Sequence, residues 1–185
     1  IKLGAIVVPG TLQLTKKDIA YRANAANIEM FVCLNDAYVV EQMELAKEQA
    51  PCIKHIALVD NTEREGWINF NKELMEQSDV YERPTGDAAT KNTDIMQIYF
   101  TSGTTGMPKM VCHNYIHPLG HIVTAKYWHQ VQENKLHMSV SDSGWAKFGW
   151  GKIYGQWLCG AVIFAYDMDK FIPLKLMEKI THYKV

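Results

Sequence analysis

A loop rich in glycine and hydroxyl side chains, closed by a lysine, constrains this chain more than any other feature. The loop follows an apolar stretch at 95–100 that is expected to form a buried strand. Backbone N–H groups, hydroxyls and one ammonium group at the end of a strand can bind an oligophosphate. Gly103 and Gly106 allow the backbone to approach a ligand closely, and Pro108 stiffens the exit towards Lys109. The sequence therefore predicts a phosphate-binding loop, made of Thr101, Ser102, Gly103, Thr104, Thr105, Gly106, Met107, Pro108 and Lys109.

This loop is not a Walker A loop, in which Gly-Lys-Ser/Thr follows the first glycine after four residues. Here Pro108 stands where that pattern requires a second glycine, and Met110 follows Lys109. The run from Thr101 to Lys109 resembles instead the phosphate-binding loop of the AMP-forming acyl-CoA synthetases and their adenylate-forming relatives, which reads Thr-Ser-Gly-Thr-Thr/Ser-Gly-x-Pro-Lys. Every defined position matches. A surface turn is the usual interpretation of such residue clusters, but the length of this match favours a phosphate loop.

Two further segments resemble the acetyl-CoA and medium-chain acyl-CoA synthetase branch of this family. Residues 3–22, with Pro9-Gly10-Thr11 and Asp18-Ile19-Ala20-Tyr21-Arg22, are similar to its Gly-Ala-x-x-x-Pro-Gly-Thr…Asp-Ile-x-Tyr-Arg segment, and Asp142-Ser143-Gly144-Trp145 to its Ser/Ala-Asp-x-Gly-Trp segment. Without the resemblance, the second segment is a capped strand–turn–helix corner with a packed tryptophan. The resemblance implies that the following helix borders an acyl pocket, for which aromatic rings and glycines are suitable. The pocket residues expected on this basis are Trp145, Phe148, Gly149 and Trp150.

The resemblance implies that the intact protein activates a carboxylic acid in two steps. The acid reacts with ATP to give an acyl-adenylate and pyrophosphate, and coenzyme A then accepts the acyl group and releases AMP. ATP and coenzyme A are the expected co-substrates, and Mg²⁺ is the expected ion, with its ligands mostly outside this chain. The expected acid is a short- to medium-chain fatty acid. Two alternatives stay open: an adenylate-forming ligase with another acyl acceptor, and a non-catalytic nucleotide-binding or interaction module.

Several parts of the family pattern are not found in this sequence. They include the Tyr-Gly-x-Thr-Glu segment, the ribose-binding Asp and the small C-terminal domain with its adenylation lysine. The sequence also starts at Ile1 within an expected strand. We therefore expect a fragment of the large N-terminal domain that contains no catalytic residue and has no synthetase activity alone.

Composition limits the class of protein and its partners. With 185 residues, 48% hydrophobic and 21% charged, the chain can form a globular domain with a sizeable core. The net charge of −1 argues against a nucleic-acid partner. No apolar run approaches the ~20 residues of a membrane span, and no signal-peptide pattern is present. No protein partner can be inferred. The cysteines form no Cys-x-x-Cys pair, which predicts free thiols in a reducing compartment, the cytoplasm; they are Cys33, Cys52, Cys112 and Cys159.

Three histidines, His113, His117 and His121, recur every four residues and would line one face of a continuous helix. Pro118 and Gly120 disturb such a helix, and no carboxylate or cysteine joins the histidines at ligand spacing. We therefore expect no metal site.

Strands and helices alternate over short connections, which predicts an α/β fold with a mostly parallel sheet flanked by helices. Ligands on such sheets bind beyond the carboxyl ends of the strands, where we expect the phosphate loop. We divide the chain into an N-terminal α/β portion at 1–83, a linker loop at 84–94 and a phosphate-loop α/β portion at 95–185.

The expected elements follow from apolar periodicity and from capping residues. Thr15 with Asp18 is expected to cap one helix, and Asp36 another. The other expected helices are Trp67–Gln77, with Phe70, Leu74 and Met75 buried, then Ile116–Gln130, Phe148–Leu158, and a last one from Pro173 with Leu174, Met177 and Ile180 on one side. The expected strands are Leu3–Val8, Met30–Leu34, His55–Val59, 95–100 and Ala161–Tyr166, with strand character also at Met138 and Val140, and a short strand at Met110 and Val111 that returns from the loop.

Overall fold

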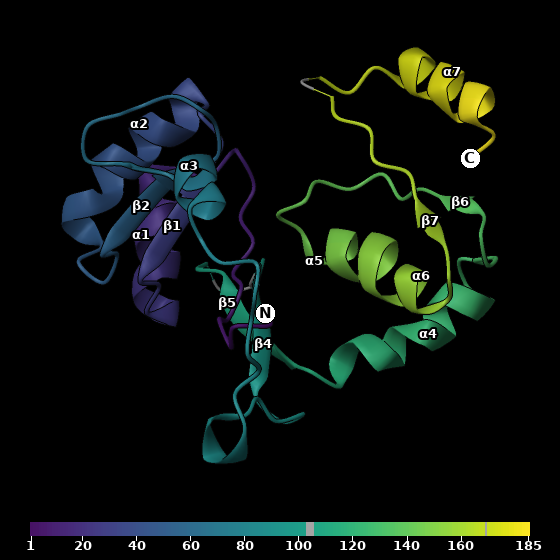
Figure 1. The fold of residues 1–185 in the computed structure, drawn as a ribbon. Coiled ribbons are helices and arrows are strands. Elements are labelled where there is room, and N and C mark those ends of the chain that lie inside the picture. The colour runs from purple at the N-terminus through teal and green to yellow at the C-terminus, as the bar shows by residue number, and fades with distance from the viewer. Residues whose placement is uncertain (103–105, 169) are drawn as a thin grey trace.

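The computed structural model describes residues 1–102, 106–168 and 170–185. It has the α/β architecture expected from the sequence, with parallel strands flanked by helices (Figure 1). The helices are α1 (Lys16–Ala26), α2 (Ala37–Ala46), α3 (Phe70–Met75), α4 (His117–Tyr127), α5 (Ala146–Phe148), α6 (Gly155–Leu158) and α7 (Pro173–Tyr183). The strands are β1 (Met30–Cys33), β2 (His55–Leu58), β3 (Ile68–Asn69), β4 (Ile95–Thr101), β5 (Lys109–Asn114), β6 (Leu136–His137) and β7 (Val162–Ile163).

The first lobe, purple to blue in Figure 1, is a parallel sheet in the order β1–β2–β3 with α1 and α2 packed beside it. Thr15 and Asp18 form a capping box on α1, and the Asp36 carboxylate accepts a hydrogen bond from the Val39 amide at the start of α2. Both caps confirm the expectation, because they satisfy amides that a helix start leaves free. The core of this lobe consists of Ile19, Ala20, Ala23, Val40, Met43, Ala46, Ala50, Ile56, Leu58 and Trp67.

Strands β4 and β5 form an antiparallel hairpin next to this lobe (Figure 1). Thr101 pairs with Lys109 at the loop end of the hairpin. On its other edge, β4 receives one parallel bridge, between Gln97 and Val7 of the N-terminal segment. The preceding segment at 84–94 is mostly exposed and contains a 3-10 turn at Gly86–Ala88.

The second lobe, green to yellow in Figure 1, is built on α4 and on the helical stretch from α5 to α6. A π-helical turn at Gly149–Tyr154 joins α5 to α6. Helix α6 packs closely on α4, because Gly155 lies where a methyl group would overlap the backbone carbonyl of His121. Helix α7 contacts the chain after β7, with the Tyr183 and Phe164 rings 5.3 Å apart. None of the helices in the described ranges is both long enough and apolar enough to cross a membrane.

The strand expected at Leu3–Val8 is wrong. Val7 makes only the isolated bridge with Gln97, and Leu3 is 77% exposed. Gly4, at φ +78°, lies in a turn closed by the hydrogen bond from its amide to the Ile1 carbonyl. This turn redirects the chain before an extended pairing with β4 can begin.

The helix expected at Trp67–Gln77 is shorter, because its first residues pair as β3 beside β2. Asn69 then caps α3 by accepting a hydrogen bond from the Lys72 amide. Leu74 and Met75, expected to be buried, are 57% and 84% exposed. With six residues, α3 lies at the edge of the sheet and cannot bury a whole apolar face.

The strand character expected at Met138 and Val140 is also wrong, since β6 ends at His137. The strand expected at Ala161–Tyr166 is reduced to β7. In the part of the chain that the structure describes, β6 and β7 pair only with each other. Each strand has two residues, so among the described residues β7 has no partner beyond Ile163 along which it could continue.

Candidate functional site

The predicted phosphate loop joins the two strands of the β4–β5 hairpin. Thr101 and Lys109 form the last residue pair of the hairpin, and the Thr101 hydroxyl lies 3.5 Å from the Lys109 carbonyl oxygen. Because β4 and β5 are antiparallel, the loop does not lie at the carboxyl edge of a parallel sheet, as the alternation of elements had suggested. The tight return brings Thr101 and Lys109 side by side, which the linear sequence alone does not require.

The described residues of the loop face solvent. Thr101, Ser102, Gly106, Met107 and Lys109 are exposed, while Pro108 is half-buried. Gly106 has φ +112°, a conformation that favours glycine, and no atom lies within 4 Å of the position that a Cβ would occupy. This open backbone and the exposed Lys109 ammonium fit an anionic ligand. The predicted loop residues Gly103, Thr104 and Thr105 lie outside the described residues.

The strand below the loop is buried and leads to the predicted acyl-pocket residues. Tyr99 is buried, and its hydroxyl accepts a hydrogen bond of 2.9 Å from the Gln97 amide group. Burial raises the pKa of Tyr99 to about 12. The Tyr99 ring packs edge-on against Trp150, with centroids 5.9 Å apart, and Gly149 lies against the Tyr99 hydroxyl.

The structure brings two of the four predicted pocket residues together under the loop strand. Gly149 and Trp150 are buried there, Phe148 is half-buried, and Trp145 is 55% exposed where α5 begins. Gly149, Gly151 and Gly155 share the helical stretch from the π turn into α6. The π turn and the buried Lys152 in it were not predicted from the sequence, although the close spacing of these glycines indicates tight packing. Burial lowers the pKa of Lys152.

The three regularly spaced histidines gather around Trp150. The His121 ring stacks on Trp150 at 5.0 Å and 6°, and the Nε2 atoms of His117 and His121 are 3.2 Å apart. Burial, followed by the charge of His117, lowers the pKa of both His113 and His121. Within the described ranges, no group of three or more His, Cys, Asp or Glu side chains has a geometry that could hold a metal ion.

Two sequence segments with a shared resemblance meet in space. Gly144 packs so closely on Gly10 and Thr11 that a methyl group at Gly144 would overlap their backbone atoms. The Asp142 carboxylate accepts a 2.7 Å hydrogen bond from the Gly144 amide and fixes the turn. This contact joins the turn before α5 to the N-terminal segment beside the hairpin.

Comparison with known proteins places this arrangement in a family. The family of AMP-binding enzymes matches residues 1–185, and with them the hairpin loop. The chain belongs to the AMP-binding enzyme family. Among its relatives, human mitochondrial acyl-coenzyme A synthetase ACSM3 is 30% identical over 186 residues, and human mitochondrial ACSM4 is 33% identical over 187 residues. Both alignments cover 100% of this chain but only 31% of the relative, so the chain spans about a third of their length.

Two solved structures share the fold of this chain. An anthranilate CoA ligase, AuaEII, in complex with anthranoyl-AMP, superposes on 100% of this chain and 35% of its own, with a TM-score of 0.81 and 19% identity. Acyl-CoA synthetase from Brucella canis superposes on 98% of this chain and 32% of its own, with a TM-score of 0.76 and 18% identity. At these identities, the likeness shows the fold alone.

Proposed function

We propose that the intact protein is an AMP-forming acyl-CoA synthetase. The observation that carries the proposal is the hairpin loop, in which the exposed Lys109 and the open backbone at Gly106 stand beside Thr101 and Ser102. Relatives that share this region are named acyl-coenzyme A synthetases. The proposed reaction joins a carboxylic acid to ATP, releases pyrophosphate, and transfers the acyl group to coenzyme A.

In this proposal the loop holds the pyrophosphate part of ATP while negative charge builds on it. The hydroxyls of Ser102, Thr104 and Thr105 donate hydrogen bonds to the β- and γ-phosphates, and Lys109 supplies the countercharge. Gly103 and Gly106 let backbone amides approach the phosphates. Donors held in place before the reaction stabilise developing charge without reorganisation.

The acid is proposed to be a short- to medium-chain fatty acid bound beside β4. Trp150 and Gly149 lie under the loop strand and would limit the depth of the pocket, with Phe148 and Trp145 nearer its mouth. This proposal is supported by the contact of Trp150 with Tyr99, whose strand continues directly into the loop. Aromatic and glycine residues of this kind suit an apolar ligand.

We further propose that Mg²⁺ accompanies ATP. Mg²⁺ is commonly held by substrate phosphates and only one or two carboxylates.

The proposed compartment is reducing, with the cytoplasm as the expected location. All four cysteines, each in the described part of the chain, are free thiols, and burial raises the pKa of Cys33 to about 11. The human relatives are named as mitochondrial. Fractionation of cells that express the tagged intact protein would test the proposal, and recovery in the mitochondrial fraction would contradict the cytoplasmic location.

The test of the function is carboxylate-dependent exchange of pyrophosphate into ATP by the intact protein. Acids from acetate to decanoate, and benzoate, would be compared with Mg²⁺ present, followed by acyl-CoA formation with the preferred acid. Exchange with a preference for short to medium chains, and a thioester product, are expected. Exchange without a thioester would favour another acyl acceptor, and no exchange with any acid by folded protein would favour a nucleotide-binding module.

A further inference from the structure

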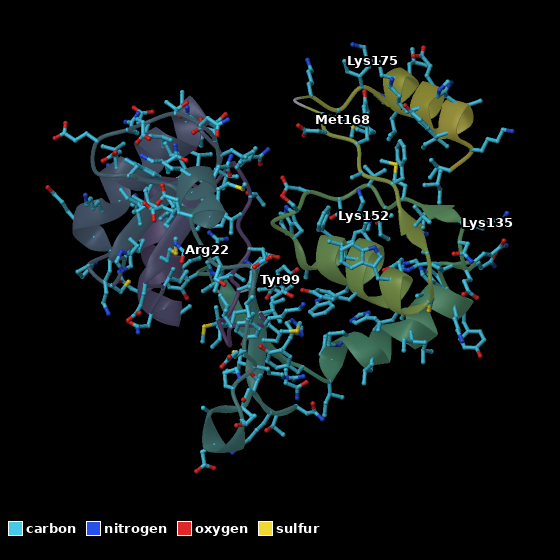
Figure 2. The ribbon with its side chains drawn as sticks, in the orientation of Figure 1. Arg22, Tyr99, Lys135, Lys152, Met168 and Lys175 are labelled. Atoms are coloured by element: carbon cyan, nitrogen blue, oxygen red, sulfur yellow. The ribbon has the colours of Figure 1, made fainter. Side chains whose placement is uncertain are left out.

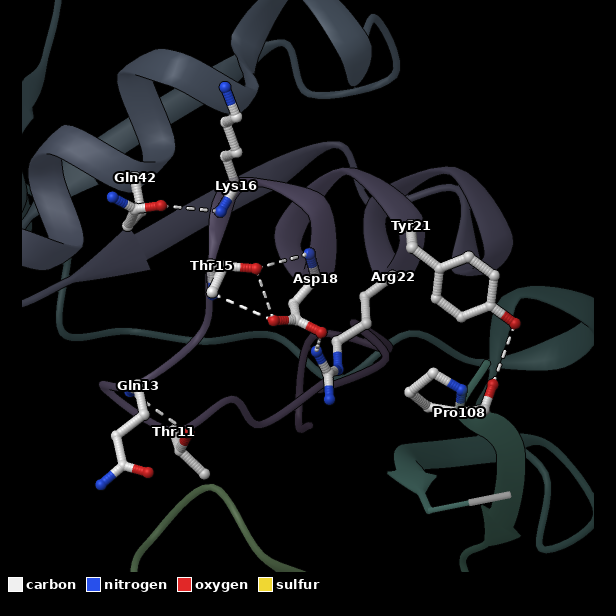
Figure 3. Close-up of polar contacts among 9 residues, drawn as sticks. All are labelled: Thr11, Gln13, Thr15, Lys16, Asp18, Tyr21, Arg22, Gln42 and Pro108. Carbon is white, nitrogen blue, oxygen red and sulfur yellow. Dashed lines mark hydrogen bonds and ion pairs between the residues drawn. The ribbon is translucent and has the colours of Figure 1, made fainter. Parts of the chain in front are cut away.

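Helix α1 contacts both arms of the phosphate loop, at residues that the proposed reaction does not use. The Tyr21 hydroxyl donates a 2.9 Å hydrogen bond to the carbonyl of Pro108, 87 positions along the chain (Figure 3). The Tyr21 ring also meets Phe100, on the other arm, edge-on with centroids 6.1 Å apart. One side chain therefore touches the chain just before the loop and just before Lys109.

The next residue on α1 makes a second contact with the same arm. The Arg22 guanidinium lies over the Phe100 ring, 5.5 Å from its centroid. Its Nη1 atom is buried and lies 3.5 Å from Asp18, the acid of the capping box (Figure 3). Figure 2 labels Arg22 in the first lobe, in the orientation of Figure 1. The capping box with Thr15 fixes Asp18. The Arg22 guanidinium therefore lies between the Asp18 carboxylate of α1 and the Phe100 ring of β4.

These contacts are separate from the core of the lobe. The core residues of α1 are Ile19, Ala20 and Ala23, whereas Tyr21 and Arg22 are half-buried at the side of the hairpin. Removing the Tyr21 hydroxyl should therefore leave the packing of α1 intact.

We propose that Tyr21 and Arg22 are positioning residues for the phosphate loop. They hold Phe100 and Pro108 at a set separation and thereby aim Lys109, which follows Pro108 directly, at the phosphates. This inference rests on the proposed function, because it assigns Lys109 a ligand.

The test compares Tyr21→Phe and Arg22→Lys with a control, Tyr38→Phe, in the intact protein. Tyr38 is an exposed tyrosine of α2 in the same lobe. In pyrophosphate exchange, the Tyr21→Phe protein should lose kcat/KM for ATP by roughly 3- to 10-fold, the loss expected for one hydrogen bond. Its KM for the carboxylic acid should not change, and Tyr38→Phe should behave as the wild type.

Hydrogen–deuterium exchange of the same proteins supplies a readout that does not depend on activity. Peptides covering residues 101–110 should exchange faster in the Tyr21→Phe and Arg22→Lys proteins, while peptides from β1 and β2 keep their wild-type rates. If the wild type shows no pyrophosphate exchange, the proposed function fails and this measurement still decides the positioning role. Unchanged hydrogen–deuterium exchange at residues 101–110 in the variants, or faster hydrogen–deuterium exchange throughout the protein, would overturn the inference.

Discussion

Gly144 shows how one residue without a side chain can join two distant segments. Its amide is bound by the Asp142 carboxylate, and its α-carbon lies against the backbone of Gly10 and Thr11. The helix cap expected at this corner, from Asp142 or Ser143, is wrong, because α5 starts after Trp145 with no side-chain cap among the described residues. No local pattern indicated the N-terminal segment that the turn meets. A methyl group there has no room, because the atoms that it would overlap belong to the backbone and cannot rotate away.

We expect Gly144→Ala to lower the free energy of unfolding of the intact protein by about 1–3 kcal/mol, the usual cost of overpacking. Gly120→Ala is the matched control. Gly120 lies within α4, and no atom lies within 4 Å of its missing Cβ. Alanine also favours the helix by about 1 kcal/mol over glycine. Urea denaturation followed by circular dichroism would measure the free energy of unfolding of both variants. Equal values for the two variants would contradict the packing argument.

Lys109 is the residue on which the proposed phosphate site depends most directly. It is exposed next to the paired Thr101, so its ammonium can move to a ligand without breaking a contact of the core. We expect Lys109→Ala in the intact protein to lower the rate of pyrophosphate exchange by roughly 10²- to 10³-fold, as for the loss of one preorganised donor. Thermal unfolding should stay unchanged. Lys17→Ala, at an exposed position of α1, is the control, and a wild-type exchange rate in Lys109→Ala would remove the assignment.

At the scale of elements, three pieces meet at Trp150: β4 with β5, α4, and the π turn. Tyr99 comes from β4, His113 from β5 and His121 from α4. Their rings surround an indole whose Nε1 is buried and has no hydrogen-bond partner among the described residues. A π turn widens the helix locally and is often found at functional sites. The cluster therefore connects β4, the strand that leads into the hairpin loop, with β5, α4 and the π turn.

The histidines of this cluster predict a pH dependence of stability. The pKa values of His113 and His121 are lowered, first by burial and then by the charge of His117. The unfolded chain then binds more protons than the folded one at acid pH, so stability is present above about pH 6.5 and is lost as the pH falls through the folded pKa values.

This dependence can be measured by urea denaturation at about pH 7.5 and about pH 5.5. We expect the wild type to lose stability between the two, and His121→Asn to lose less, whatever its stability at the higher pH. His182→Gln, at an exposed position of α7, should keep the wild-type difference. An equal loss in the wild type and in His121→Asn would show that His121 does not carry the effect.

At the scale of the whole molecule, contacts between segments far apart in the sequence hold the two lobes and the hairpin together. Val7 bridges β4, Tyr21 binds the carbonyl of Pro108, and Gly144 rests on Gly10 and Thr11. The division of the chain at 84–94 stays a prediction. Each of these three contacts joins a residue before position 84 to a residue after position 94.

Residues 1–185 alone are expected to form no acyl-CoA and to bind ATP weakly at best. The chain spans 31% of the length of its human relatives, so about two thirds of such a protein lies outside the matched region. The measurement is AMP and thioester formation from ATP, coenzyme A and octanoate, with the intact protein as the positive control. Thioester formation by residues 1–185 would contradict the expectation.

Local signals in the sequence determined the features that depend on neighbours along the chain. At the helix starts, the Thr15 and Asp36 side chains each accept a hydrogen bond from an amide three residues further along the chain. Both helix starts could therefore be predicted from the sequence. The buried face of α2 likewise follows from spacing within one helix. The family could be predicted because its motif lies in consecutive residues, from Thr101 to Lys109, whereas the binding of phosphate by this loop stays a prediction.

The tertiary structure alone decided which segments meet. The exposure of Leu74 and the absence of a strand at Leu3–Val8 depend on which edges and faces are free, and apolar periodicity does not report this. The same holds for the contact of Tyr21 with Pro108, whose partners are 87 residues apart. A hydrogen bond or a close glycine contact across such a distance is set by packing of whole elements, so no local pattern in the sequence can specify it.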